Sequence, residues 1–140
     1  MNKNVLLMET AKLWSKASHA KRHKVGCIIA KDHRILSTGY NGTLPGRNNS
    51  CEKDGVTLDE VMHAEQNALI FCSKHGLSTQ GCSIYVTLSP CMACSKMIIM
   101  SGIKELFYAE SYRDLSPLDL LRSEGVKVTQ IKEELSNESK

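Results

Sequence analysis

Two short motifs, His-x-Glu and Pro-Cys-x-x-Cys, constrain the fold of this 140-residue chain more than any other feature. The first contains His63 and Glu65, and the second contains Cys91 and Cys94. One imidazole and two thiols are zinc ligands, and three protein ligands leave the fourth tetrahedral position open for water, as in catalytic zinc sites. The fold must therefore bring the two motifs together and place the Glu65 carboxylate beside that open position.

The composition is ordinary for a soluble globular protein, with 41% hydrophobic and 24% charged residues. No apolar run approaches the roughly 18 residues of a membrane span, and no charged leader precedes an apolar segment. We therefore expect a cytoplasmic protein with no membrane partner, in which a Cys-x-x-Cys pair binds metal rather than forming a disulfide. A single domain is expected over residues 1–131, followed by a polar tail over 132–140.

The pattern of apolar residues predicts a three-layer α/β fold. Gly76, Gly102 and Gly125 are expected to end three of the helices, and residues 41–57, rich in Gly, Pro, Asn and Ser, to form an irregular loop. Helices that alternate with strands late in the chain predict parallel strands joined by right-handed crossovers, with helices on both faces of one sheet. We expect helices at 2–18, 61–74, 90–101 and 117–124, and strands at 25–30, 35–40, 82–88, 103–109 and 126–131.

The two cysteines are expected at the start of a helix. They are three residues apart, so both sulfurs lie on one face of a first helical turn. Ser89 is expected to be the N-cap and Pro90 the first helical residue, as are Ser116 and Pro117 in the next helix. The positive end of the helix dipole favours thiolates over thiols, which prepares Cys91 and Cys94 for metal binding.

His63 and Glu65 require a helix start as well. Two residues apart in the middle of a regular helix, they would point in well-separated directions and could not both face one ion. The Thr-x-x-Glu pattern at 57–60 has the form of a capping box and predicts a helical turn there. We therefore expect the helix to be interrupted just before His63, with Glu65 in the first turn of the helix that starts there.

The combined pattern of His-x-Glu and Pro-Cys-x-x-Cys is typical of zinc-dependent nucleobase deaminases. Zinc lowers the pKa of a bound water from roughly 15.7 to about 7. Glu65 would then move a proton from that water to a ring nitrogen and to the leaving amine. A structural zinc site in a non-enzymatic binding module is the alternative, although such a site has no use for a carboxylate beside an open coordination position.

The chain resembles the cytidine and deoxycytidylate deaminase superfamily, and within it the deoxycytidylate (dCMP) deaminase branch. The resemblance extends from about residue 18 to 131 and implies a cytidine-deaminase-like fold, a five-stranded mixed sheet flanked by helices. It also implies hydrolysis of dCMP to dUMP and ammonia for thymidylate synthesis, one zinc ion per subunit, and a homo-oligomer, with a hexamer favoured. The motifs that carry it are Lys24-Val25-Gly26-Cys27, Thr38-Gly39-Tyr40-Asn41-Gly42, His63-Ala64-Glu65-Gln66-Asn67-Ala68 and Gly102-Ile103-Lys104-Glu105.

The resemblance implies a set of substrate-binding residues. Arg22 would meet the 5′-phosphate, Asn41 would hydrogen-bond the nucleoside, and Tyr112 would cover the base. The backbone around Ala64 and Ser89 would present N–H and C=O groups to the pyrimidine edge. Each side chain also has a simpler interpretation.

Arg22 could belong to a solvated basic turn in which Lys21 or Lys24 meets the phosphate. Asn41 could be a plain turn residue, and Tyr112 an ordinary surface or core aromatic.

The loop after residue 41 has a further role in relatives, where a glycine-rich segment binds dCTP as activator or dTTP as inhibitor with Mg²⁺. Gly42, Gly46 and Asn49 are the candidates here, although Arg47 departs from the pattern of the relatives. The remaining cysteines are expected to be small buried hydrophobic residues (Cys27, Cys72, Cys82) or to lie in the loop (Cys51).

Two other substrates remain open. dCTP carries the same base and sugar as dCMP and differs in its phosphates. A deaminase of tRNA or single-stranded nucleic acid would need a basic channel and stacking aromatic residues. With a net charge of +3, two Phe, four Tyr and one Trp, the chain offers little of either, and we expect no nucleic-acid partner.

Overall fold

The two central strands are built from continuous apolar sequence, as expected for strands that are buried on both faces. In the computed structural model, which describes residues 1–135, these are β1 (Gly26–Lys31) and β5 (Ser83–Leu88). The other sheet strands are β2 (Arg34–Tyr40), β6 (Glu105–Glu110) and β7 (Lys127–Gln130), and a separate short hairpin consists of β3 (Glu52–Lys53) and β4 (Val56–Thr57). The helices are α1 (Lys3–Ser15), α2 (Ala64–Lys74), α3 (Met92–Met100) and α4 (Ser116–Ser123).

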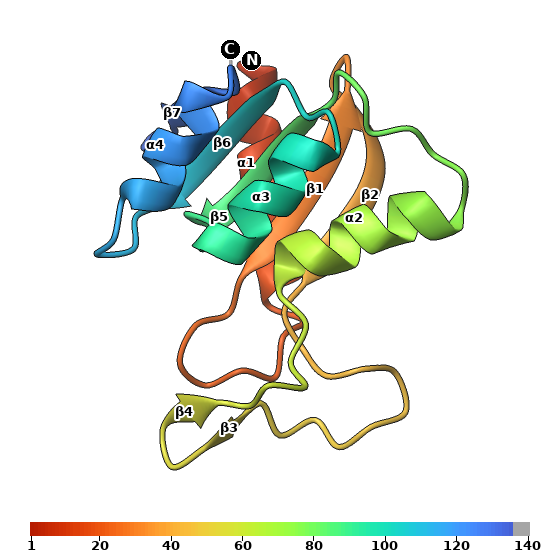
Figure 1. The fold of residues 1–140 in the computed structure, drawn as a ribbon, viewed down its shortest axis with the longest axis vertical. Coiled ribbons are helices and arrows are strands. Elements are labelled where there is room, and N and C mark those ends of the chain that lie inside the picture. The colour runs from red at the N-terminus through yellow and green to blue at the C-terminus, as the bar shows by residue number, and fades with distance from the viewer. Residues whose placement is uncertain (136–140) are drawn as a thin grey trace.

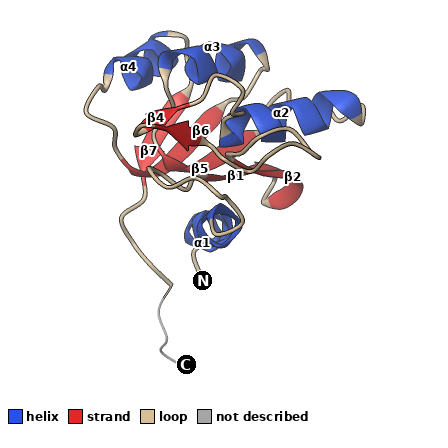
Figure 2. Cartoon of the chain, turned by 90° about the horizontal axis from the view of Figure 1, so that it is seen from below, coloured by secondary structure: helices blue, strands red, loops and turns tan. Residues whose placement is uncertain are grey.

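The five-stranded sheet has the order β2-β1-β5-β6-β7. β1 is antiparallel to both of its neighbours, whereas β5, β6 and β7 are parallel, so the sheet is mixed. α1 covers one face, and α2, α3 and α4 cover the other (Figure 2). The predicted three-layer fold and its parallel later strands are therefore confirmed.

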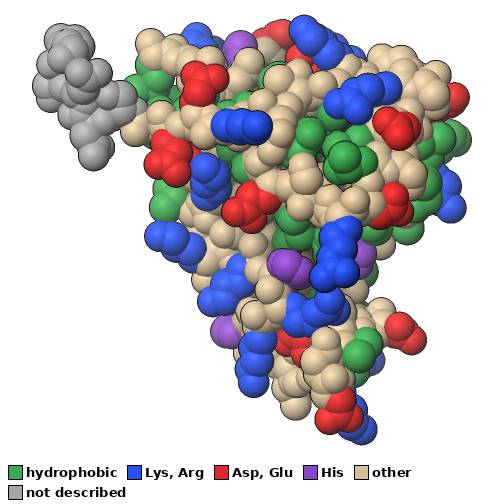
Figure 3. All heavy atoms as spheres, turned by 90° about the vertical axis from the view of Figure 1, so that its left-hand side faces the viewer, with side chains coloured by type: hydrophobic (Ala, Val, Ile, Leu, Met, Phe, Trp, Pro, Cys, Tyr) green, Lys and Arg blue, Asp and Glu red, His purple; other side chains and the backbone are tan. Residues whose placement is uncertain are grey.

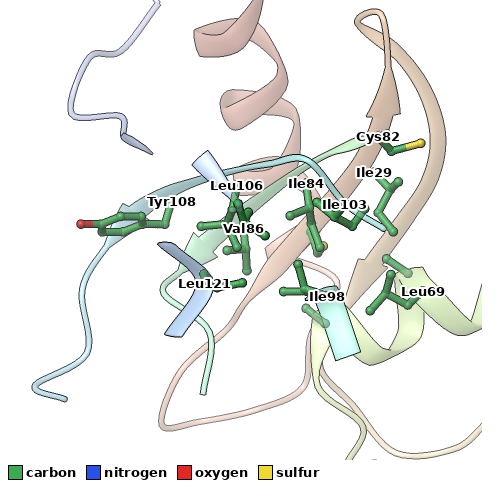
Figure 4. Packing of buried hydrophobic residues seen from close by; sticks show 14 of the residues in the cluster. Ile29, Leu69, Cys82, Ile84, Val86, Ile98, Ile103, Leu106, Tyr108 and Leu121 are labelled. Carbon is green, nitrogen blue, oxygen red and sulfur yellow. The ribbon is translucent and has the colours of Figure 1, made fainter. Parts of the chain in front are cut away.

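Side chains that alternate along the central strands form a separate core on each face. Ile28 and Tyr85 point toward α1, and Tyr85 stacks on Phe107 with ring centroids 4.6 Å apart. On the opposite face, Leu69, Ile98 and Leu121 come from α2, α3 and α4 respectively and pack against the strands (Figure 4). Cys27, Cys72 and Cys82 are fully buried in this second core, as predicted.

Several elements cluster at the end of the sheet where β5 finishes. α2 and α3 both begin there, and the hairpin β3–β4 extends beyond it (Figure 1). The carboxyl ends of parallel strands are the usual place for ligand sites in open α/β sheets. Within residues 1–135, no helix is both long and apolar enough to cross a membrane.

The helix start at residue 63 confirms one prediction and corrects another. α2 begins at Ala64 with His63 as its N-cap, so the expected break before His63 is present. The predicted helical turn at 57–60 is wrong, because Thr57 ends strand β4 and accepts a hydrogen bond from the Arg22 guanidinium. Glu60 pairs with Arg47 and does not reach back to cap a helix.

The two Ser-Pro helix starts are each displaced from the prediction. α3 begins at Met92 with Cys91 as N-cap, because the Ser89 hydroxyl accepts a hydrogen bond from the Tyr112 backbone N–H instead. α4 has Leu115 as N-cap, so Ser116 is its first residue. Both helices still begin within two residues of the predicted positions.

The segment 41–57 is not wholly irregular, since it contains the hairpin β3–β4. Asp54 and Gly55 form its turn with φ of 53° and 77°. Two positive φ values at an Asp-Gly pair are typical of a tight hairpin turn, and this dipeptide was the overlooked signal in the sequence.

Of the predicted tail, residues 132–135 are described and Leu135 packs against the core on the α1 face, while 136–140 lie outside the described residues.

Gly39 sets how closely α2 approaches the sheet. A Cβ at this position would collide with the Ala64 carbonyl oxygen and lie 2.9 Å from the Ala68 backbone nitrogen. Gly39→Ala should therefore lower the free energy of unfolding by about 1–3 kcal/mol through overpacking, measured by urea denaturation.

Gly42→Ala is the matched control for this substitution. No atom lies within 4 Å of a Cβ built at Gly42, so reduced freedom of the unfolded chain should leave stability unchanged or raise it by up to ~1 kcal/mol. Equal unfolding free energies for the two variants would contradict the close approach of α2.

Candidate metal centre and adjoining pocket

The three predicted ligands meet at the starts of two helices. Cys91 is the N-cap of α3 and Cys94 lies in its first turn, while His63 is the N-cap of α2. The His63 Nδ1 atom lies 3.6 Å from the Cys91 Sγ atom and 3.3 Å from the Cys94 Sγ atom. Within the described part of the chain, this is the single group of three or more His, Cys, Asp or Glu residues that could hold a metal ion.

The spacing of these atoms fits zinc. A tetrahedral ion with typical Zn–N and Zn–S bonds places the nitrogen and sulfur ligands about 3.6 Å apart. The observed separations are 3.6 and 3.3 Å, and all three ligand atoms lie within 4.8 Å of one another. Both the donor set and its geometry therefore match a zinc site with three protein ligands.

The two thiols differ in their protonation without metal. Hydrogen bonds from Cys94 and then from His63 lower the pKa of Cys91 to about 4. The pKa of Cys94 is raised, first by its hydrogen bond with Cys91 and then by burial. Zinc binds both sulfurs as thiolates.

Glu65 is buried beside the ligands, with 4% of its surface exposed. It lies in the first turn of α2 and lines the same pocket as His63 and Cys91. Burial, the largest effect, raises the pKa of its carboxyl to about 7 in the metal-free protein. A carboxyl with a pKa near neutrality can both accept and donate a proton.

The pocket in front of the ligands contains all of the predicted substrate residues. Its empty space, including the open mouth, is about 620 Å³. Its lining includes Ala64, Ser89, Arg22, Asn41 and Tyr112, contributed by five separate segments of the chain.

The Asn41 side chain is held by two hydrogen bonds to a neighbouring loop. Its Oδ1 atom accepts from the Val25 N–H at 2.9 Å, and its Nδ2 atom donates to the His23 carbonyl at 2.8 Å. These bonds join the end of β2 to the start of β1. Asn41 therefore has a clear structural role in shaping the pocket wall.

Tyr112 lies at the mouth of the pocket, 42% exposed. Its ring packs edge-on against His23, with centroids 5.7 Å apart. Its backbone N–H donates to the Ser89 hydroxyl at 2.8 Å. The aromatic ring is thus placed over the pocket from the loop between β6 and α4.

Sequence reasoning missed several lining residues of the pocket, among them the polar residues His23, Glu52 and Thr57. Glu52 and Thr57 belong to the hairpin β3–β4. Their proximity to Arg22 depends on long-range packing, so only the Asp-Gly turn of that hairpin could have pointed to them. His23 lies beside Arg22 in the sequence and carried no signal of its own.

The candidate effector residues lie in a second hollow next to the pocket. Gly42, Gly46 and Asn49 line it, and the two hollows share Asn41 and Cys51. Gly42 is tied to Met62 by two backbone hydrogen bonds of 3.0 and 2.8 Å. This bridge connects the candidate loop directly to the residue that precedes His63.

Comparison with known proteins identifies the family. Residues 1–110 match the model of the cytidine and deoxycytidylate deaminase zinc-binding region. The chain belongs to this deaminase family. The matched residues include the three ligands and Glu65, so the family's zinc-binding region coincides with the site described above.

Several known proteins are similar to most of the chain. ComE operon protein 2 of Bacillus subtilis (strain 168) is 37% identical over 91% of this chain and 70% of its own length. The deoxycytidylate deaminase of Enterobacteria phage T4 is 33% identical over 87% of this chain and 86% of its own length. A crystal structure of dCMP deaminase from the cyanophage S-TIM5, in complex with dCMP and dUMP, has a TM-score of 0.87 and 43% identity, covering 90% of this chain and 94% of that chain.

Gln66 should be important for zinc affinity in this deaminase. Its Oε1 atom accepts a hydrogen bond from the His63 backbone N–H at 2.8 Å and so fixes the N-cap that carries the imidazole. Loss of a group that orients a ligand typically weakens metal binding by about 10–100-fold. We expect a loss in this range for Gln66→Ala, measured by competition with a chromogenic chelator.

Gln66→Glu is the matched control, because a Glu at the same helical position also accepts from the N-cap N–H. It should retain zinc affinity close to that of the unsubstituted protein. Unchanged zinc affinity in Gln66→Ala would show that His63 is oriented by other contacts.

Proposed function

We propose that this protein is a zinc-dependent deaminase that hydrolyses dCMP to dUMP and ammonia. The observation that carries the proposal is the convergence of three zinc ligands and the buried Glu65 carboxylate at one pocket. A structural zinc site would not require a buried carboxylate beside its ligands. The similarity to deoxycytidylate deaminases over most of the chain supports dCMP as the substrate.

The reaction replaces the exocyclic amine of cytosine with the oxygen of water. Zinc held by His63, Cys91 and Cys94 would lower the pKa of a bound water to about 7 and so supply hydroxide at neutral pH. The Glu65 carboxylate accepts the proton of that water and donates it to the neighbouring ring nitrogen. A C–O bond forms at the amine-bearing carbon, Glu65 then carries the remaining hydroxyl proton to the amine, and the C–N bond breaks to release ammonia and leave the uracil carbonyl.

The substrate is held by the residues that line the pocket. The backbone of Ala64 and Ser89 faces the pyrimidine edge, Asn41 binds the nucleoside, and Tyr112 covers the base. Arg22 meets the 5′-phosphate, to which its guanidinium can donate two hydrogen bonds. Their common position around one pocket supports these roles.

Two alternative substrates are separable by experiment. A nucleic-acid deaminase is disfavoured by the mild net charge and the few aromatic residues. dCTP differs from dCMP only beyond the α-phosphate. An ultraviolet assay on cytidine, deoxycytidine, dCMP and dCTP side by side would rank the four.

Three further expectations accompany the proposal. A homo-oligomer, with a hexamer favoured, is expected by analogy with the family. Regulation by dCTP or dTTP with Mg²⁺ at Gly42, Gly46 and Asn49 is supported by the hollow that these residues line. A cytoplasmic location fits the free cysteines of the site, and a role in supplying the thymidylate precursor follows from dUMP as the product.

Glu65→Gln should abolish turnover while leaving zinc in place. The amide has the size of the carboxyl but cannot take up the water proton, and general acid–base catalysis typically contributes about 10²–10⁴-fold. We expect kcat for dCMP to fall at least about 10²-fold. The zinc content, measured by elemental analysis, should stay the same. Glu60→Gln, the same change at an exposed position, is the control, and near-normal turnover in Glu65→Gln would refute the role of Glu65.

Arg22→Ala should impair dCMP far more than deoxycytidine, because only the nucleotide carries the phosphate. A charged hydrogen bond is worth about 1.5–3 kcal/mol, so KM for dCMP should rise about 10–100-fold while KM for deoxycytidine stays nearly constant. Lys21→Ala is the control for the neighbouring basic residue. Equal effects of Arg22→Ala on both substrates would mean that the phosphate is bound elsewhere.

A further inference from the structure

We propose that Glu52, assisted by Thr57, is a positioning residue that holds Arg22 in place for the substrate phosphate. This inference rests on the proposed function, because it presupposes a phosphorylated substrate. It assigns a purpose to the hairpin β3–β4, which contributes nothing to the main sheet. Glu52 and Thr57 line the same pocket as Arg22.

Glu52 fixes the backbone of the loop that carries Arg22. Its Oε2 atom accepts a hydrogen bond from the Lys21 N–H at 2.9 Å and another from the Arg22 N–H at 3.0 Å. The segment that joins α1 to β1 has neither helix nor strand at these residues. The loop is therefore held by the two hydrogen bonds that the Glu52 oxygen accepts rather than by hydrogen bonds of a helix or a sheet.

Thr57 contacts the side chain of the same residue. The Arg22 Nη1 atom lies 3.5 Å from the Thr57 Oγ1 atom. Thr57 is the direct cross-strand partner of Glu52 in the hairpin. One rung of the hairpin thus contacts both the backbone and the guanidinium of Arg22.

A small apolar cluster anchors the hairpin to the loop. Ala20, Cys51 and Val61 are buried against one another, with Leu58 packed beside them. The Leu58 N–H also donates to the Cys51 carbonyl at 2.8 Å. Ala20 directly precedes Lys21, and Cys51 directly precedes Glu52. The cluster therefore holds Glu52 next to the loop that carries Arg22.

The arrangement leaves the guanidinium charge available. In the described residues Arg22 forms no ion pair, because the Glu52 carboxylate binds backbone N–H groups instead. Lys, Arg and His side chains gather on the face shown in Figure 3, where the molecule narrows toward the hairpin. An anionic group that enters the pocket would therefore meet an oriented and unpaired guanidinium.

The test compares Glu52→Ala with Glu52→Gln. Loss of both hydrogen bonds in Glu52→Ala should raise KM for dCMP about tenfold, with kcat and KM for deoxycytidine unchanged. The Gln amide oxygen can still accept from both N–H groups, so Glu52→Gln should stay within about threefold of the unsubstituted enzyme. Thr57→Val should raise KM for dCMP by a smaller factor and also leave deoxycytidine unaffected. Glu60→Ala, in the same segment, should leave KM for both substrates unchanged.

Binding of the products gives a readout that does not depend on turnover. In calorimetric titrations, Glu52→Ala should weaken the binding of dUMP about tenfold and leave deoxyuridine unaffected. Equal weakening of both ligands would overturn the inference, since general damage to the pocket affects both. An unchanged dUMP affinity in Glu52→Ala would overturn it as well.

The double variant separates this inference from the proposed function. If Arg22→Ala selectively weakens dUMP, then adding Glu52→Ala to it should cause no further loss, because Glu52 acts through Arg22. Additive losses, or a selective effect of Arg22→Ala without one of Glu52→Ala, would refute the positioning role alone. If Arg22→Ala weakens dUMP and deoxyuridine equally, the assignment of Arg22 to the phosphate is refuted. If the unsubstituted enzyme does not turn over dCMP, the proposed function is refuted.

Discussion

The site depends on two helices, α2 and α3, whose N-terminal ends lie next to each other. Each helix start supplies unpaired N–H groups and the positive end of a helix dipole, and each supplies ligands at or near its N-cap. His63 can share a metal with Cys91 and Cys94 only because α2 begins one residue after it. The close contact of α2 with Gly39 sets where that start lies above the sheet, so one glycine in β2 contributes to the geometry of the metal centre.

The rest of the pocket is built from segments with little regular structure. Arg22, Asn41 and Tyr112 lie in three different loops, and each loop is fixed by side-chain hydrogen bonds to a backbone. Asn41 holds the residues before β1, Ser89 holds the Tyr112 backbone, and Glu52 holds the Arg22 backbone. Rigid helices and strands thus carry the chemistry, while polar contacts between loops shape the part of the pocket that selects a substrate.

The sheet, its helices and the metal ligands could be predicted from the sequence because their signals are local. Apolar periodicity defines strands and helices, and ligand spacing defines the zinc motif. The predicted caps at Thr57 and Ser89 were wrong because both hydroxyls are used by distant partners, Arg22 and the Tyr112 backbone. Local sequence does not reveal such tertiary competition. The hairpin β3–β4 was missed although Asp54 and Gly55 gave a turn signal, because strands of two residues carry no periodicity.

The two faces of the sheet are protected very unequally. Three helices share one face, whereas among the described residues α1 is the one helix on the other, which contains Ile28, Tyr85 and Phe107. A chain without its first fifteen residues would keep every residue of the site and still expose a continuous apolar surface to water. Such surfaces favour aggregation. The N-terminal helix, which contributes no residue to the site, therefore protects the enzyme from aggregation through this face.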